Sequence, residues 1–280
     1  MLKTALFGAG QVGTMALRLL GGRVCCVADN SREKRGTTLL GVQVVSPEES
    51  LEYAPERFCL CVTDAARAAE MREQLRALGY AGEIIDARAL RLFDARDATA
   101  LLLAEQINAL GLEGDTAELG VYKGSFAELM ARAFPGRRLH LFDTFEGFAP
   151  EDVAVERREG LSRAKEGDFS GSSVEAVRAR LERPELAVFH VGRFPESFAG
   201  CESARFVFVS LDADLYAPTA AALPIFYDRL VPGGVILLHD VNGSQYPGAG
   251  RALAEFCSER RLLPIPICDL HASAILRKPL

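Results

Sequence analysis

Two acidic residues stand where a sheet protein could bind a metal ion. Asp212 directly follows the apolar run Arg205–Leu211, and Asp240 closely follows the apolar run Val235–Leu238. Both runs read as parallel strands, and open α/β sheets bind ligands beyond the carboxyl ends of such strands. Two carboxylates from neighbouring strand ends can face one Mg²⁺ ion, which prefers oxygen ligands and keeps positions open for substrate oxygens. Such an ion would orient a vicinal diol and lower the pKa of its hydroxyl group.

Neighbouring residues offer further ligands and a proton acceptor. Asp214 is a candidate third ligand, although chain alternation could instead turn it to cap the next helix, and capping is also the alternative for Asp212. Asn242 could add a neutral oxygen ligand. An alcohol hydroxyl is barely acidic, so activating one needs a base, for which Asp212 and His239 are the catalytic candidates. The alternative for His239 is a purely structural histidine at a strand end.

A glycine-containing turn follows the expected strand Thr116–Leu119. Its ExGxxxG pattern is common in methyltransferases that use S-adenosylmethionine (SAM), where the loop lies beside the methionine part of the cofactor. Asp143 ends the next expected strand, where an acid binds ribose hydroxyls in nucleotide-binding folds. We expect the cofactor site to contain Glu118, Gly120, Tyr122, Gly124, Asp143, Thr144, Phe145, Gly192 and Arg193. For the two aromatic residues, ordinary packing is the alternative.

The first 90 residues carry a separate nucleotide-binding pattern. An expected strand leads into Gly8-Ala-Gly10-Gln-Val-Gly13, a helical pattern follows, and Asp29 closes the second strand. Such glycines let the backbone approach a pyrophosphate, and the acid could bind ribose. The unit is short for a full dinucleotide site, so a scaffold or oligomerisation role is the alternative. We expect domains at 1–90 and 111–280, joined by a connecting helix at 91–110.

Strands and helices alternate through the second domain as they do in the first. Its expected strands are Thr116–Leu119, Arg138–Phe142, Ala187–Val191, Arg205–Leu211 and Val235–Leu238. Its expected helices include Ser125–Ala133, Val174–Leu181, Pro224–Leu230 and Gly250–Arg260. The final runs Leu263–Cys268 and Ala272–Arg277 are close enough to form a hairpin. We predict an α/β protein with two Rossmann-like domains, the second a class I SAM methyltransferase sheet with an antiparallel last strand.

Residues 117–257 resemble the macrocin O-methyltransferase (TylF-like) family. The segments that carry the resemblance are Glu118–Ala127, Leu141–Phe148, Gly192–Ser197, Phe206–Tyr216 and Pro232–Asp240. Matches that occur in the same order along the chain are far more specific than any single motif. The resemblance implies SAM as cofactor, a divalent metal ion, usually Mg²⁺, and methylation of a sugar hydroxyl, often on a glycoside. Residues 1–90 lie outside it.

Two segments could shape the acceptor site. Between Phe148 and Ser172 the chain is charged and carries few periodic apolar residues, so it reads as a solvated loop or as a lid over the acceptor. The glycine-rich segment Asn242–Gly250 follows the second acid and could set acceptor specificity. His140 and His190 lie in expected strands and are predicted to be buried or to support the site.

Composition limits the classes of function. The net charge of −6 disfavours binding to nucleic acid, and no apolar run approaches the ~20 residues that span a bilayer. The seven cysteines read as reduced thiols and the N-terminus lacks an export signal, which predicts a cytoplasmic protein. The expected partner is a small-molecule acceptor, a sugar or glycoside, and exposed strand edges of the first domain would permit a homodimer. The alternative functions are an NAD(P)-binding sugar-modifying enzyme and a noncatalytic nucleotide-binding assembly protein.

Overall fold

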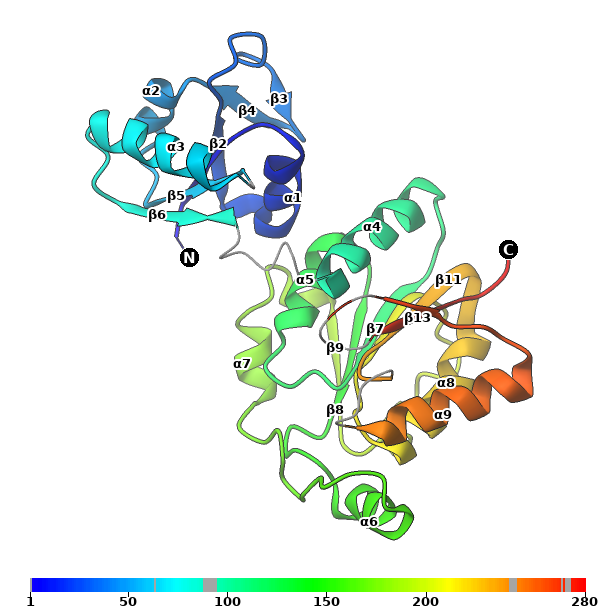
Figure 1. Cartoon of the computed structure of the whole chain (residues 1–280). Helices are drawn as coiled ribbons and strands as arrows, with labels where there is room; N and C mark the ends of the chain where they lie inside the picture. Colours follow the sequence, from blue (N-terminus) through cyan, green and yellow to red (C-terminus); the bar gives the residue numbers. More distant parts are fainter. Residues whose placement is uncertain (1, 63, 88–94, 242–245, 268, 270–272) are drawn as a thin grey trace. The chain divides into compact units, whose positions relative to one another are not determined.

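The computed structural model describes the chain except residues 1, 63, 88–94, 242–245, 268 and 270–272. The described residues form two compact units, Met1–Ala98 and Thr99–Leu280 (Figure 1). The predicted Asn242 ligand and much of the predicted Asn242–Gly250 loop fall outside the described residues.

The first unit is built on a six-stranded sheet with the strand order β3-β4-β2-β1-β5-β6, parallel except for the β3–β4 pair. The strands are β1 Thr4–Phe7, β2 Val24–Ala28, β3 Thr38–Leu39, β4 Val42–Val45, β5 Arg57–Leu60 and β6 Glu83–Asp86. The helices are α1 Gln11–Leu20, α2 Pro47–Ser50 and α3 Ala65–Ala77. Successive residues of β1 point to opposite faces, so Leu6 packs with α1 and Phe7 with α3.

In the glycine turn of the first unit, the backbone at Gly8 and the backbone at Gly13 pack directly against each other. A Cβ on Gly13 would overlap the carbonyl oxygen of Gly8, so α1 starts in direct contact with the end of β1. The Asp29 carboxylate binds this turn through the Ala9 amide at 2.6 Å, and it also accepts from the Ser31 amide at 2.8 Å. Burial alone would raise the pKa of Asp29, but these hydrogen bonds lower it. A ribose-binding role for Asp29 stays a prediction.

The second unit holds a seven-stranded sheet with the strand order β12-β13-β11-β10-β7-β8-β9. The strands are β7 Asp115–Leu119, β8 Leu139–Asp143, β9 Ala187–Val191, β10 Phe206–Leu211, β11 Leu230–Leu238, β12 Ile265–Pro266 and β13 Ala274–Arg277. The helices are α4 Ala95–Ala109, α5 Ser125–Ala133, α6 Pro150–Glu159, α7 Val174–Arg178, α8 Tyr216–Arg229 and α9 Pro247–Arg260. β7 to β11 pair in parallel, whereas β13 is antiparallel to both β11 and β12. The predicted antiparallel last strand is confirmed.

The central strand β10 positions the candidate site. All of its residues are buried, and it pairs with β7 on one side and β11 on the other. Asp212 comes directly after β10 and Asp240 comes two residues after β11 ends at Leu238. The sheet order therefore brings both acids and the turn after β7 to the same edge.

Helix α4 is attached to the second unit through its carboxyl-terminal half. The Asn108 side chain donates to the carbonyl oxygen of Ala133 at 3.0 Å, and Arg277 donates to Gln106 at 2.6 Å. Ile107 between them is fully buried. Of the connecting helix expected at 91–110, residues 91–94 lie outside the described residues, and Ala95–Ala109 forms α4. The division between the two units falls after Ala98, within the first turn of this helix.

One helix differs from the prediction, and another extends beyond the segment expected to be helical. α6 occupies part of the segment expected to be a charged loop or a lid. The sequence did not reveal this helix, because its buried residues are one valine and two acids, which produce no apolar periodicity. α8 spans Tyr216–Arg229 and so contains the expected helical segment Pro224–Leu230 except Leu230, which begins β11. Pro218 falls in the first turn, where its missing N–H costs no hydrogen bond. The buried Phe226 and its neighbours pack α8 on the sheet despite the proline inside the helix.

Lys278 ties the end of the chain to the end of α8. Its Nζ donates to the carbonyl oxygens of Tyr227, Asp228 and Leu230 at 3.2, 3.1 and 2.9 Å. The last carbonyls of a helix have no partner inside the helix, so an ammonium group there is stabilising. We expect Lys278→Met to lower the free energy of unfolding by about 1–3 kcal/mol, measured by urea denaturation.

The matched control is Lys165→Met, which removes the same charge from an exposed position. Surface substitutions of this kind change stability by less than about 0.5 kcal/mol. Equal losses in the two variants would show that the contacts of Lys278 are not stabilising.

Candidate functional site

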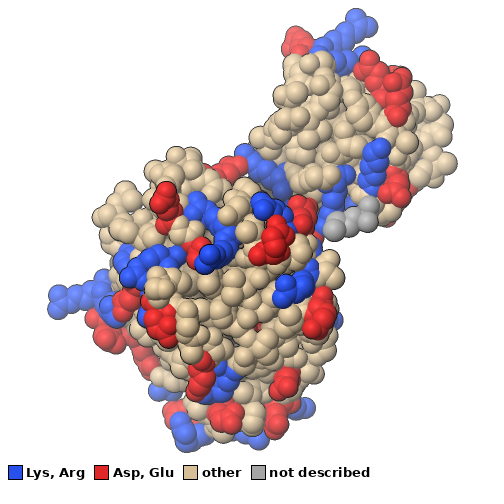
Figure 2. Space-filling view, turned by 180° about the vertical axis from the view of Figure 1, so that it is seen from behind, with Lys and Arg blue, Asp and Glu red and all other residues tan. Residues whose placement is uncertain are grey.

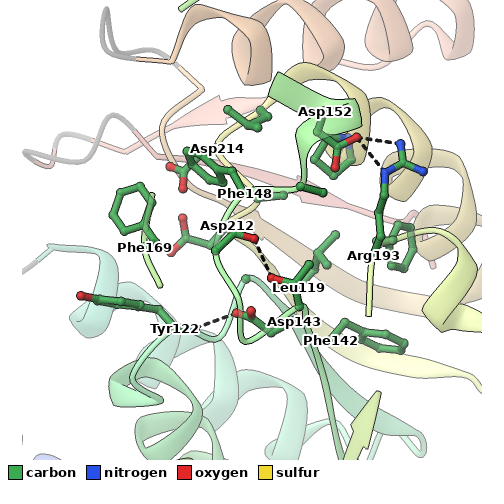
Figure 3. A pocket seen from close by; sticks show the side chains of 18 of the residues that line it. Leu119, Tyr122, Phe142, Asp143, Phe148, Asp152, Phe169, Arg193, Asp212 and Asp214 are labelled. Carbon is green, nitrogen blue, oxygen red and sulfur yellow. Dashed lines mark hydrogen bonds and ion pairs between the residues drawn. The ribbon is translucent and has the colours of Figure 1, made fainter. Parts of the chain in front are cut away.

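A cavity of about 390 Å³ opens at the carboxyl ends of the parallel strands of the second unit (Figure 3). Its walls come from the segments after β7, β8, β9, β10 and β11, and from α6 and the residues around it. Of the predicted site residues, it is lined by Gly120, Tyr122, Asp143, Thr144, Gly192, Arg193, Asp212, Asp214, His239 and Asp240. The predicted cofactor loop and the predicted metal ligands therefore share one space.

Three predicted cofactor residues are not among those that line this cavity. Glu118 is buried within β7, and Gly124 is the N-cap of α5. The Phe145 ring packs near Phe189, with 6.2 Å between the ring centroids. Their predicted contacts with the cofactor stay predictions.

The acidic residues form a compact cluster around His239. Nδ1 of His239 lies 2.9 Å from Oδ1 of Asp212 and 3.0 Å from Oδ2 of Asp240. With Asp214, these side chains offer ligand atoms that all lie within 4.8 Å of one another. Carboxylate oxygens dominate the set, which suits a hard divalent cation such as Mg²⁺. The donor chemistry thus fits the metal ion implied by the sequence.

The backbone and the electrostatics of the cluster are unusual. Asp214 and Asp240 adopt φ angles of +57° and +55°, in the left-handed region that aspartate enters more readily than most residues. Burial alone would raise the pKa of Asp240, but the hydrogen bonds of His239 and Asp214 lower it. Asp240 is therefore held as a carboxylate, the form that binds a cation.

The glycine loop and the acid cluster are in direct contact. Gly120 has a φ of +86°, and a Cβ at this position would overlap the carbonyl group of Asp212. The Asp212 amide in turn donates to the carbonyl oxygen of Leu119 at 2.8 Å, as Figure 3 shows. A glycine is needed here for two reasons, the backbone angle and the close approach of the two loops.

Asp143 supports the same loop from the end of β8. Its Oδ2 accepts hydrogen bonds from the amides of Val121 and Tyr122 at 2.7 and 2.8 Å, and its Oδ1 accepts from the Phe145 amide at 2.7 Å. A carboxylate has about four acceptor positions, so these bonds leave capacity for a ligand hydroxyl. The sequence predicted the position of Asp143 in the cavity but not its contact with the loop.

Helix α6 adds an ionic contact that sequence reasoning missed. Asp152 is buried, and its Oδ1 accepts from Nη2 and Nε of Arg193 at 2.7 and 3.1 Å. Burial raises the pKa of Asp152, while hydrogen bonding to Asp152 raises the pKa of Arg193. Glu156 also anchors this helix, since its Oε1 accepts from the Tyr216 amide at the start of α8 at 2.8 Å. The first part of the segment expected to be a loop or a lid, Pro150–Glu159, is thus a helix with contacts to Arg193 and to the start of α8.

Aromatic rings form one wall of the cavity. Tyr122 meets Phe169 with 5.6 Å between ring centroids, Phe169 meets Phe148 at 5.2 Å, and Phe148 meets Tyr246 at 6.0 Å. Figure 3 shows Tyr122, Phe148 and Phe169 around the opening. Sequence reasoning missed Phe169 and Tyr246, although an aromatic residue inside a charged segment is a signal that could have been used. Such rings offer apolar faces to an acceptor.

Figure 2 shows acidic and basic side chains interspersed over the face that it draws. Within the described part of the chain, every helix is too short or too polar to cross a bilayer. Cellular location, dimerisation and the absence of nucleic-acid binding stay predictions.

Comparison with known proteins supports the assignment of the second unit. The sequence profile of the macrocin-O-methyltransferase (TylF) family matches residues 89–277. The 8-demethyl-8-(2,3-dimethoxy-alpha-L-rhamnosyl)-tetracenomycin-C 4'-O-methyltransferase of Streptomyces olivaceus is 32% identical over 148 residues, covering 49% of this chain and 56% of that protein. The mycinamicin III 3''-O-methyltransferase of Micromonospora griseorubida is 27% identical over 142 residues, covering 46% and 56%. The matched part spans little more than half the length of these relatives.

Solved structures show the same fold. The O-methyltransferase NovP superposes with a TM-score of 0.53 at 19% identity, covering 66% of this chain and 80% of NovP. The calicheamicin methyltransferase CalS11 superposes with a TM-score of 0.52 at 20% identity, covering 77% of this chain and 87% of CalS11. The class I methyltransferase sheet predicted for the second unit is therefore confirmed.

Proposed function

The chain belongs to the TylF macrocin-O-methyltransferase family, and from this premise we propose that it transfers the methyl group of SAM to a hydroxyl of a sugar or glycoside with the help of Mg²⁺. One observation carries the proposal: the glycine loop after β7 and the acid cluster line the same cavity and touch through Gly120 and Asp212. A methyl donor held by the loop would lie beside an acceptor held by the acids.

The substrate class rests on the relatives and on the cavity wall. The two curated relatives are named for O-methylation of a rhamnosyl tetracenomycin and of mycinamicin III. The aromatic wall of this chain, Tyr122, Phe148, Phe169 and Tyr246, gives an acceptor an apolar surface beside the acids. A molecule with vicinal hydroxyls on an apolar body would use both features.

The proposed mechanism asks little covalent chemistry of the protein. The sulfonium of SAM is already activated, so the chain must align the acceptor oxygen with the methyl carbon and remove a proton. Asp212 and Asp240, with Asp214 beside them, would hold the cation. When bound, a divalent cation supplies the positive charge that lowers the pKa of the acceptor hydroxyl and fixes its orientation.

Asp212 and His239 are the candidate proton acceptors. Nδ1 of His239 already lies between Asp212 and Asp240, so the proposed part of His239 is to keep both carboxylates in place. Asp212 is then the group that accepts the hydroxyl proton. Asp143 and Gly120 are proposed to position the ribose and the methionine part of SAM, since both line the cavity beside the acids.

The test is binding and turnover with the full chain. Calorimetry with SAM and, on the same sample, NADH should show binding of SAM alone. Mass spectrometry should then show one added methyl group on rhamnosylated acceptors and none on the corresponding sugar-free compounds. Binding of NADH without SAM would move the active centre to the first unit, and methylation of the sugar-free compounds would contradict the proposed substrate class.

Removing divalent cations should stop the reaction without releasing SAM. We expect EDTA to lower the rate of methyl transfer at least about tenfold, because the hydroxyl then keeps its ordinary pKa. Mg²⁺ added in excess should restore the rate, while SAM affinity measured by calorimetry stays unchanged throughout. An undiminished rate in EDTA would contradict the metal-assisted mechanism but leave SAM-dependent transfer standing.

A further inference from the structure

A second group of potential metal ligands lies on the large sheet, away from the cavity that holds the acids. His140 is near the start of β8, His190 is in β9, and Cys201 lies in the segment before β10. His140 and Cys201 line a separate cavity of about 330 Å³, beside the residues that precede β7, β8 and β10. None of these side chains has a part in the proposed methyl transfer.

The ligand atoms of this group all lie within 4.8 Å of one another. Nδ1 of His140 lies 3.0 Å from Nε2 of His190, and Sγ of Cys201 lies 3.9 Å from Nδ1 of His140. The same sulfur lies 3.5 Å from Nε2 and 3.7 Å from Nδ1 of His190, so it lies beside that ring and must turn toward Nε2 to share an ion with it. Around tetrahedral Zn²⁺, the usual bond lengths place two nitrogens about 3.3 Å apart and a nitrogen and a sulfur about 3.6 Å apart. We propose that His140, His190 and Cys201 bind a transition-metal ion of the Zn²⁺ class.

Asp115 gives the group the outer contact that such sites use. Its Oδ2 lies 3.2 Å from Nε2 of His140, the ring nitrogen that faces away from the other two ligands. A carboxylate at this nitrogen accepts its hydrogen, which leaves Nδ1 with a free lone pair. Metal-bound histidines are held in this way by a carboxylate, a carbonyl or a water.

The two histidines are already joined through their ring nitrogens. The two imidazole rings lie within 4° of parallel, and a shared hydrogen joins their facing nitrogens. A metal ion would replace that hydrogen once the Cys201 side chain turns toward Nε2 of His190.

Two arginines and one acidic residue lie around the three proposed ligands. Arg138 and Arg205 line the same cavity as Cys201, and Asp115 is the acid that faces it. A thiolate and this carboxylate offset the charge of a divalent ion, so the arginines do not prevent binding. The cavity leaves room for a water molecule as the fourth ligand.

The test uses Co²⁺, whose absorption reports a thiolate ligand. The purified full chain is stripped with a chelator and titrated with Co²⁺, then with Zn²⁺. We expect tetrahedral cobalt bands, a thiolate-to-cobalt charge-transfer band, and displacement of both by Zn²⁺ at one equivalent. The charge-transfer band separates this site from the oxygen-rich cluster at Asp212.

Variants assign the band to the group. Cys201→Ser should lose the thiolate band and the Zn²⁺-induced rise in melting temperature. Cys257→Ser, which changes another buried cysteine of the same unit, should keep both. Asp115→Asn retains every ligand and should weaken Zn²⁺ binding about 10- to 100-fold, which decides the matter if Cys201→Ser does not fold.

Two results would overturn the proposal. The first is a chain that shows no thiolate band with Co²⁺, which would make the group a metal-free hydrogen-bonded network. The second is a band that persists in Cys201→Ser, or a Zn²⁺ affinity that Asp115→Asn leaves unchanged. Methyl-transfer activity enters neither result, so the outcome is independent of the proposed function.

Discussion

Asp212→Asn and Asp240→Asn are each expected to lower the rate constant of methyl transfer by about 100-fold or more while SAM still binds. Asparagine preserves the size of each side chain but removes the negative charge that would hold a cation. At position 212 it also removes the carboxylate that would take the proton from the substrate hydroxyl. His239 Nδ1 contacts both carboxylates, so either change also removes one side of its support. Rates are measured by mass spectrometry at saturating acceptor, and SAM affinity is measured by calorimetry.

The matched control is Asp228→Asn, which neutralises an exposed carboxylate on α8 that pairs with Arg260. It should leave both the rate and SAM affinity near those of the unchanged chain. If the Asp212 and Asp240 variants both kept full activity, the acid cluster would have no catalytic part. If they lost SAM binding as well, the cluster would be serving the cofactor loop rather than the acceptor.

Gly120→Ala is expected to weaken SAM binding and slow methyl transfer together. The new Cβ would overlap the carbonyl of Asp212, which is backbone and cannot rotate away, and alanine is strained at a φ of +86°. The loop after β7 and the loop after β10 must therefore both shift. We expect at least about a tenfold loss of SAM affinity, measured by calorimetry, in a variant whose circular dichroism remains that of the unchanged chain.

The control Gly136→Ala separates the effect of backbone strain from the effect of the overlap with the Asp212 carbonyl. Gly136 also has a positive φ, +80°, but a Cβ there would meet no atom within 4 Å. This control should cost about 1 kcal/mol of stability through backbone strain alone and keep its affinity for SAM. Of these two glycines, Gly120 is the one that contacts the loop after β10. Similar SAM affinities in the two variants would therefore contradict a functional role for the contact between the loops after β7 and β10.

Parts of this site could be predicted because their signals are local in sequence. A strand followed by an acid marks Asp212, Asp240 and Asp143, and the parallel order of the sheet then brings these positions to one edge. The glycine at 120 is recognisable from its pattern after a strand. The neighbour that makes it necessary, the carbonyl of Asp212, lies far along the chain and leaves no local signal.

Other parts of the site could not be predicted, because the partners of their side chains are distant in sequence. Helix α6 buries Asp152 and Glu156, whose partners are Arg193 and the Tyr216 amide, both distant in sequence. Buried acids look like solvated charges until those partners are known. The metal ligands that we propose on β8 and β9 likewise read as ordinary buried histidines until the fold places Cys201 beside them.

Helix α4 has a consequence for how this protein can be taken apart. Gln106 and Asn108 are bonded to Arg277 and Ala133, and the family match already begins at residue 89. A chimaera in which another domain replaces the first unit would therefore have to keep the whole of α4 and join the new domain before it. A transferase module started at residue 111 would lack the buried Ile107 side chain and the hydrogen bonds that α4 makes to Ala133 and Arg277.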